Sequence, residues 1–469
     1  MITKIEIDGF KTFSDFKMEF APLTVIAGAN ASGKSNLFDA MLLLSRIVEV
    51  DLKTAFSEQR GEANELFTQF SQKENAEEIF FGVELLIDKS IKDKFGGETR
   101  LKYTRLRYEV KIQKITNERN VDDLVIVHES LNPIRHNDDI WIRTYVPSNC
   151  IEYWRPKVKS GKRGVAYIDT DNNRAISLRQ DGTGGVKKEY PLNKIHQAII
   201  SVVNSIDFPH ALAAKEEIKG WKFLQLNPEE LRKPSSYLAK DYLTHTGQNL
   251  AATLHRIKTE DPLFIKDISR RLNSLLPSIN DVDVIDDKVG KQFVIQIKTT
   301  DGREFTSRVL SEGTLRLLTL CVFLFDPQHR GLICFEEPEN GIHPARLKMM
   351  TELLRDLVSE FTDPNSELRQ VIVNTHSPVL VGDIFNHESN ALSQIWFSEL
   401  VTQIKPYNNK RLKIQTTKII PVVYSGGSQM TIDFSENEKK LTVAKVVSFL
   451  QTGDFEKTIL EIQKQIDNE

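Results

Sequence analysis

One eight-residue stretch near the start of the chain constrains the fold more than any other. Residues 28–35 read Gly-Ala-Asn-Ala-Ser-Gly-Lys-Ser, which matches the pattern G-x-x-x-x-G-K-[ST] at every fixed position. The pattern requires a strand before it and a helix after it. The apolar run 23–27 and the apolar stripe over 37–48 supply both. The sequence therefore predicts an α/β core in which a buried strand leads into a phosphate-binding loop at the start of a helix.

The residue types in this loop predict its ligands. Glycines let backbone N–H groups turn toward phosphate oxygens. We expect Lys34 to reach the β- and γ-phosphates of ATP and the Ser35 hydroxyl to meet Mg²⁺. The predicted ATP-binding residues of the loop are Gly28, Asn30, Ala31, Ser32, Gly33, Lys34, Ser35 and Asn36.

Two adjacent carboxylates end a second apolar run. Glu336 and Glu337 follow residues 332–335, and consecutive side chains of a strand point in opposite directions. We expect Glu336 to hold the Mg²⁺ shell and Glu337 to turn toward the attacking water as the base for ATP hydrolysis. Taken alone, acids after an apolar run more often mark a solvated loop end.

Two further polar loops, each next to an apolar helix or strand, could belong to the same nucleotide site. Ser311 is a natural N-cap for the apolar helix after it, and Gly313 keeps the approach to that helix end open. His376 follows the apolar strand 371–373, where it would contact the γ-phosphate. Alone, each is more often an ordinary helix cap or a structural histidine. Their order after an intact P-loop favours one nucleotide site, with Glu337 and His376 as its catalytic residues.

The four motifs resemble the ABC-type ATPase heads of the SMC and RecF group. Residues 5–13 resemble the opening strand of SMC heads, 311–314 the signature loop, and His376 the switch histidine. The spelling of 336–344 is similar to that of a bacterial branch of RecF-like ATPases classified with the AAA proteins. That branch includes the ATPase subunits of the Septu and PARIS antiphage systems and the ATPase half of OLD nucleases.

The resemblance implies a homodimer, or a larger homo-oligomer with an even number of subunits, assembled head to tail. ATP bound at Lys34 of one subunit would be sealed by Ser311 and Gly313 of the other. The position on the magnesium side is usually Asp in this group, and it is Glu336 here.

The resemblance also implies a glutamine near the metal. It bears in addition on whether this chain itself carries a nuclease. Gln69 and Gln72 both follow the first helix, and we prefer Gln69 as the metal-side residue. No TOPRIM-type nuclease segment is recognised after His376. An effector nuclease or toxin would therefore be a separate protein.

The predicted fold class is α/β, an ABC-type P-loop NTPase core with a mixed sheet and an insertion of β-hairpins and helices. We predict an N-terminal lobe over 1–115 and the insertion over 116–234. The C-terminal lobe is predicted over 235–400, followed by a C-terminal extension over 401–469.

Three segments outside the motifs predict helices. Apolar residues recur at helical spacing over 195–206 and again over 443–450. Asp261 followed by Pro262 is typical of an N-cap and the first residue of a helix.

Bulk properties favour a cytoplasmic protein without a membrane partner. The longest apolar stretch, 317–325, is too short to span a bilayer, and the start lacks a secretory signal. Cys150, Cys321 and Cys334 are irregularly spaced, which indicates free thiols in a reducing compartment. The formal net charge is −3, so any binding of nucleic acid would need a local patch.

One segment offers such a patch. Residues 153–163 contain two aromatic and five basic residues and no acid. That composition suits backbone or single-stranded nucleic acid, although a solvated hairpin loop or a surface for an acidic protein fits as well. The basic residues are Arg155, Lys157, Lys159, Lys162 and Arg163.

Three functions compete on this evidence. The first is a regulatory ATPase of a bacterial antiphage system that holds or triggers a separate effector. The second is a RecF-like DNA-repair ATPase that binds DNA directly. The third is a nucleotide-dependent scaffold with negligible turnover.

Overall fold

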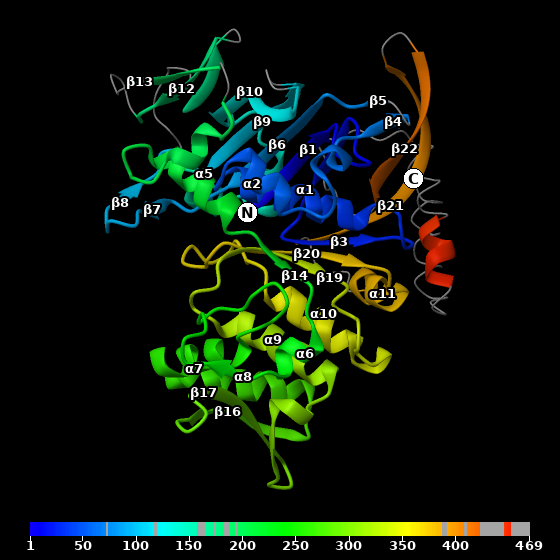
Figure 1. Ribbon diagram of the computed structural model, residues 1–469. Helices are drawn as coiled ribbons and strands as arrows, with labels where there is room; N and C mark the ends of the chain where they lie inside the picture. The colour runs from blue at the N-terminus through cyan, green and yellow to red at the C-terminus, as the bar shows by residue number, and fades with distance from the viewer. Residues whose placement is uncertain are drawn as a thin grey trace.

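The strands of the protein form two large sheets with helices between and below them (Figure 1). The computed structural model describes residues 1–71, 74–116, 120–156, 166–171, 174–181, 187–192, 195–386, 392–407, 410–422 and 445–451.

The upper sheet in Figure 1 is antiparallel and has the strand order β13-β12-β11-β10-β9-β6-β1-β2. Its alternating sequences bury one face against helix α1 and leave the other polar. Its strands are β1 (Ile2–Asp8), β2 (Phe16–Glu19), β6 (Glu78–Leu86), β9 (Arg105–Thr116), β10 (Asp122–Pro133), β11 (Ile168–Asp171), β12 (Ala175–Arg179) and β13 (Lys187–Pro191).

The central sheet is mixed and has the order β14-β19-β20-β3-β21-β22. All neighbours pair in parallel except β21 and β22, which form an antiparallel hairpin. Its inner strands are continuous apolar runs because both faces are covered. The strands are β3 (Leu23–Ala27), β14 (Lys222–Leu224), β19 (Gly331–Glu336), β20 (Arg369–Thr375), β21 (Ser393–Tyr407) and β22 (Lys410–Pro421).

Helices cover the central sheet on both faces. Helix α1 packs between the two large sheets, whereas α9, α10 and the helices beyond them pack on the opposite face (Figure 1). The helices are α1 (Lys34–Ile47), α2 (Leu52–Ser57), α3 (Ile140–Tyr145), α4 (Ile151–Trp154), α5 (Pro209–Lys219), α6 (Pro228–Arg232), α7 (Leu250–Glu260), α8 (Pro262–Leu275), α9 (Glu312–Phe325), α10 (Leu347–Asp356) and α11 (Pro378–Asn386).

Three smaller sheets complete the structure. One lies against α7 and α8 at the bottom of Figure 1, and the other two are short hairpins of the upper half. Their strands are β15 (Ser235–Ser236), β16 (Ile279–Asp287), β17 (Gln292–Thr299) and β18 (Glu304–Thr306), then β4 (Gln69–Ser71) with β5 (Glu74–Asn75), and β7 (Ser90–Lys92) with β8 (Glu98–Arg100).

These elements confirm the predicted fold class, an α/β P-loop core with a mixed sheet. The P-loop connects β3 to α1 as its sequence context requires. The predicted domain boundaries remain a prediction. The β9–β10 hairpin runs across residue 115, and β10 to β13 continue the sheet that β1 begins.

Two of the three predicted helices are confirmed. The Asp261 side chain accepts a hydrogen bond from Leu263 N (2.8 Å), and α8 begins at Pro262. A helix also occupies 445–451, where Val446, Val447 and Leu450 are buried, as predicted. Val443 lies outside the described residues.

The helix predicted over 195–206 is wrong. Only Ile199–Val202 form a 3₁₀ turn, and α5 starts later, at Pro209. Val202, which the stripe would bury, is 45% exposed, whereas the adjacent Ile199 and Ile200 are both buried. The buried Glu129 carboxylate accepts the Ile199 and Ile200 N–H groups (2.6 and 2.8 Å), and Pro209 disfavours helix in the residue before it.

The three cysteines agree with the expectation from their irregular spacing. Cys150, Cys321 and Cys334 are all free and buried, as predicted. Within the described part of the chain, every helix is too short or too polar to cross a membrane.

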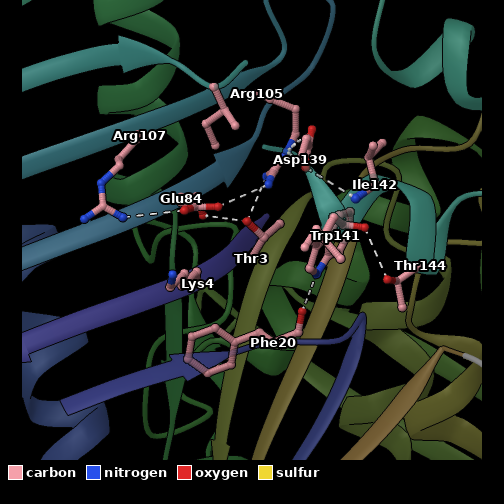
Figure 2. A network of polar contacts seen from close by, with 12 residues as sticks. Thr3, Lys4, Phe20, Glu84, Arg105, Arg107, Asp139, Trp141, Ile142 and Thr144 are labelled. Carbon is pink, nitrogen blue, oxygen red and sulfur yellow. Dashed lines mark hydrogen bonds and ion pairs between the residues drawn. The ribbon is translucent and has the colours of Figure 1, made fainter. Parts of the chain in front are cut away.

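A buried ionic network fastens the segment that contains α3 and α4 to the core (Figure 2). The Asp139 carboxylate, 0% exposed, pairs with Arg105 Nε (3.1 Å) and also with Arg155. Arg105 further donates to Thr3 Oγ1 at 2.8 Å. Arg155 is therefore a buried structural residue, and its prediction as a nucleic-acid contact is wrong.

The rest of the basic patch stays untested, since Lys157, Lys159, Lys162 and Arg163 lie outside the described residues. The prediction for Arg155 rested on the composition of 153–163 alone, and its partner Asp139 lies outside that segment.

Replacing Asp139 tests the network. Asp139→Asn keeps an N-cap for α3 but removes the carboxylate that pairs with buried Arg155 and leaves buried Arg105 with only the longer ion pair to Glu84 (3.5 Å). We expect the free energy of unfolding to fall by about 3–5 kcal/mol, as for other buried pairs that lose one partner. Urea unfolding measures the change. Asp138→Asn, at the neighbouring exposed position, is the matched control and should change little. Equal stability of the two variants would contradict the assignment.

Candidate functional site

The P-loop takes its shape from two glycines pressed against the β21–β22 hairpin. Gly28 and Gly33 have φ of 150° and 91°, which other residues rarely adopt. A Cβ atom at Gly33 would lie 1.8 Å from Thr417 Oγ1, and one at Gly28 would lie 2.4 Å from Ser398 O. The positive φ angles and the close approach of the hairpin atoms therefore favour glycine at both positions.

Lys34 lies beneath this loop. Its ammonium donates to Gly28 O and Ala29 O, both at 2.8 Å, and the residue is 6% exposed. Burial lowers the pKa of Lys34, and the carboxylates of Glu337 and Glu339 oppose that shift. The loop thus holds a cation whose described hydrogen bonds go to the loop's own carbonyl oxygens.

The other predicted loop residues line the same turn. Asn30 and Ala31 are exposed at its tip, with Ala31 in the left-handed conformation at φ 61°. Ser32 Oγ is buried without a hydrogen-bond partner in the described structure. Asn36 Nδ2 donates to Thr12 Oγ1 at 2.9 Å. The unpaired Ser32 hydroxyl, in the same loop as the Lys34 ammonium, is suited to bind a phosphate oxygen.

Asn374 of β20 lies beside the first residues of α1. Asn374 Nδ2 lies 3.4 Å from Ser35 Oγ, and the parallel register pairs Asn374 with Glu336 on the next strand. Asn374 Oδ1 is buried, and no described group bonds it. Sequence reasoning missed Asn374, although a polar residue directly after the apolar run 371–373 was a visible signal.

This arrangement fits Mg²⁺. Among the described residues no three His, Cys, Asp or Glu side chains form a metal cluster. Mg²⁺ needs no such cage, because it keeps waters and substrate phosphates around one or two protein oxygens. Ser35 and Glu336 supply oxygens of the required type.

Gln69 is not joined to these groups by any hydrogen bond within the described structure. It lies exposed on β4, where its backbone pairs with Asn75. Its role near the metal remains a prediction, and Gln72 lies outside the described residues.

Glu337 and His376 lie together at the end of β19 and β20. His376 Nδ1 is 3.2 Å from Glu337 Oε1, and Asn340 Nδ2 donates to Glu337 Oε2 at 2.7 Å. Glu337 has φ 45°, a strained conformation that costs about 1–3 kcal/mol. Its N–H is bonded to Asn374 O at 2.8 Å, which helps to hold this conformation.

Glu339 is a further site residue that sequence reasoning missed. It is 8% exposed, and its Oε1 accepts from Thr375 Oγ1 (2.5 Å) and from His376 N (3.2 Å). Glu339 therefore fixes the loop that carries His376 to the loop that carries Glu337. The third acid of Glu-Glu-Pro-Glu was the available signal.

The signature-like loop belongs to the other side of the sheet. Ser311 caps α9 by accepting from Thr314 N at 3.2 Å, as predicted for a helix cap. A Cβ atom at Gly313 would lie 3.2 Å from Gly341 O, so the loop packs closely on its own lobe. Since α9 and α1 cover opposite faces of the central sheet (Figure 1), this loop begins a helix on the face opposite to that of the P-loop helix.

Replacing Glu339 tests the connection between the two loops. Glu339→Ala leaves the Thr375 hydroxyl and the His376 N–H without their acceptor, so we expect a loss of about 1–3 kcal/mol in unfolding free energy. Urea unfolding measures it. Asn340→Ala, which removes only the contact to Glu337 from an exposed side chain, should cost less. The reverse order would show that Glu339 is not the connecting residue.

A family model described as "AAA domain, putative AbiEii toxin, Type IV TA system" matches residues 23–382. No curated protein matches the sequence.

Several solved structures of SMC heads are similar to the chain at low identity. The SMC head bound to the C-winged helix domain of ScpA is 13% identical, with 90% of this chain and 98% of that chain covered and a TM-score of 0.47. The SMC head domain from Thermotoga maritima is also 13% identical, with coverage of 90% and 99% and a TM-score of 0.37. The head from Pyrococcus furiosus with an extended coiled coil is 12% identical, with coverage of 95% and 99% and a TM-score of 0.44.

Proposed function

This chain belongs to the family of AAA domains described as putative AbiEii toxins of type IV toxin–antitoxin systems, and on that premise we propose that it binds ATP with Mg²⁺ and hydrolyses it. One observation carries the proposal. The carboxyl ends of β3, β19 and β20 bring the P-loop, Glu337 and His376 to one edge of the central sheet.

Each residue has a role that its position supports. Loop N–H groups and the Lys34 ammonium bind the phosphates and offset their charge. Glu337 accepts a proton from the attacking water, and His376, bonded to it, holds the carboxylate in place. Mg²⁺ bound at Ser35 and Glu336 would neutralise charge on the phosphate oxygens.

Two substitutions separate binding from turnover. Glu337→Gln keeps the shape of the side chain and removes the basic oxygen, so we expect ATP affinity close to that of the wild type and a hydrolysis rate at least about 100-fold lower. Equilibrium ATP binding and phosphate release measure the two quantities.

Lys34→Ala is the companion variant and should abolish ATP binding, because the described loop holds no other cation against the phosphates. Retained affinity in this variant would remove the P-loop from the proposal. If Glu336→Gln rather than Glu337→Gln blocks turnover with binding intact, the roles of the two carboxylates are reversed.

We further propose that the active form is a head-to-tail homodimer or a larger even-numbered assembly. Two features support this. Ser311 is exposed at the start of α9, and the signature-like loop lies across the sheet from the P-loop of its own chain. A second subunit would bring its Ser311 and Gly313 to the ATP held at Lys34.

Mixing two inactive variants tests the shared site. Ser311→Arg should bind ATP without turning it over, because the added cation fills the place where the partner's γ-phosphate docks. A mixture with Lys34→Ala creates dimers in which one composite site is intact, so part of the ATPase activity should return. Each variant alone, at the same total concentration, is the control. A mixture as inactive as its components would argue for sites that are complete within one chain.

The description of the family, which names toxin–antitoxin systems, supports a proposal for the biological role. We propose that ATP turnover holds or triggers a toxin or nuclease carried by a separate chain in bacterial antiphage defence. A DNA-repair ATPase and a non-hydrolysing scaffold are the alternatives. A nuclease or toxin gene beside this one would support the defence role, whereas salt-dependent DNA binding by the purified protein would favour repair.

A further inference from the structure

The β21–β22 hairpin, most of which falls in the predicted C-terminal extension, lies against the P-loop. Figure 1 shows it at the right-hand edge of the central sheet, beside β3. Ser398 Oγ of β21 donates to Ser32 O at 2.9 Å, and Ser398 O closes over Gly28. The hairpin therefore touches the loop at both of its strained ends, through Ser398 near Gly28 and through Thr417 at Gly33.

Thr417 of β22 connects the loop to the turn that follows β1. Its N–H donates to Thr12 O at 2.9 Å, and the hydroxyls of Thr417 and Thr12 are 2.6 Å apart. Thr12 Oγ1 in turn accepts from Asn36 Nδ2 in the first turn of α1. A chain of hydrogen bonds thus joins Thr417, which contacts Gly33, to Thr12 and on to Asn36 in the first turn of α1.

A second contact fixes the hairpin to the same turn. Lys405 Nζ of β21 donates to Ser14 Oγ at 2.5 Å and forms an ion pair with Asp15. A shift of the hairpin along the turn would break the Thr417–Thr12 hydrogen bond and the Lys405–Asp15 ion pair together. Contacts of both β21 and β22 with this turn therefore hold Thr417 beside Gly33.

We propose that Thr417 is a positioning residue for nucleotide binding, which holds Gly33 and the start of α1 in the phosphate-binding conformation before the ligand arrives. The inference rests on the proposed function for the identity of the ligand. A loop already fixed in its binding conformation loses less entropy when it binds, so the effect appears as affinity.

The neighbouring residue provides a matched control. Thr416 lies on the opposite face of β22, is 2% exposed, and its Oγ1 has no hydrogen-bond partner in the described structure. Thr416→Val and Thr417→Val make the same isosteric change at adjacent buried positions. Only the second removes a hydroxyl that reaches the P-loop region.

The experiment compares the two valine variants for ATP affinity, steady-state kinetics and amide hydrogen exchange. We expect Thr417→Val to weaken ATP binding about three- to tenfold, the range for one neutral hydrogen bond, and to raise KM with kcat nearly unchanged. Exchange of the amides of residues 28–36 should become faster. Thr416→Val should match the wild type in each measurement, and Thr417→Ser should restore affinity.

The exchange measurement needs no ligand, so the two proposals fail separately. Wild-type protein that binds no ATP refutes the proposed function, while faster exchange at 28–36 in Thr417→Val would still uphold the positioning role. Wild-type protein that binds ATP, with equal affinity and equal exchange in both valine variants, overturns the inference. If Thr417→Val melts far below Thr416→Val, Ser398→Ala replaces it and should also weaken ATP binding.

Discussion

The parallel pairing of β3, β20 and β19 is the constraint on which the site depends. Asn374 pairs with Ile26 on one side and with Glu336 on the other. This register ends three strands at the same edge, so a P-loop, a carboxylate pair and a histidine from distant parts of the sequence meet there. A slip of one residue would turn the side chains of a strand to the opposite face. The apolar residues on both faces of these strands oppose such a slip, because each face packs into its own core.

Much of this edge could be predicted from the sequence because the signals are local. A buried strand, a glycine-rich turn and a helix stripe each occupy a few consecutive residues, and together they identify Lys34 and Ser35. The contacts that complete the site are not local. Thr12 and Thr417 are 405 residues apart, and no pattern in either segment announces the other. Glu339 lies closer to its partner Thr375, but its role depends on the register of β19 and β20.

The wrong predictions have a shared physical origin. The stripe over 195–206 has helical spacing, yet the buried Glu129 side chain binds the Ile199 and Ile200 N–H groups and only a 3₁₀ turn forms there. Arg155 lies in a basic run, yet the buried carboxylate of Asp139, which lies outside that run, pairs with it in the core. In both cases a tertiary partner outweighed a valid local preference. Sequence periodicity and composition describe what a segment favours in isolation, and a buried polar partner elsewhere in the chain can change that outcome.

The two tryptophans of α3 and α4 have a mechanical consequence. Trp141 Nε1 donates to Phe20 O just before β3 (Figure 2), and Trp154 Nε1 donates to Phe361 O in the connection to β20. These strands carry the P-loop and His376 at their far ends. Both strands are hydrogen-bonded to a neighbour on each side, so a displacement of α3 or α4 would be transmitted along them to the nucleotide edge. In a chain whose other two tryptophans, Trp221 and Trp396, are replaced, the fluorescence of Trp141 and Trp154 would report that movement without an added label.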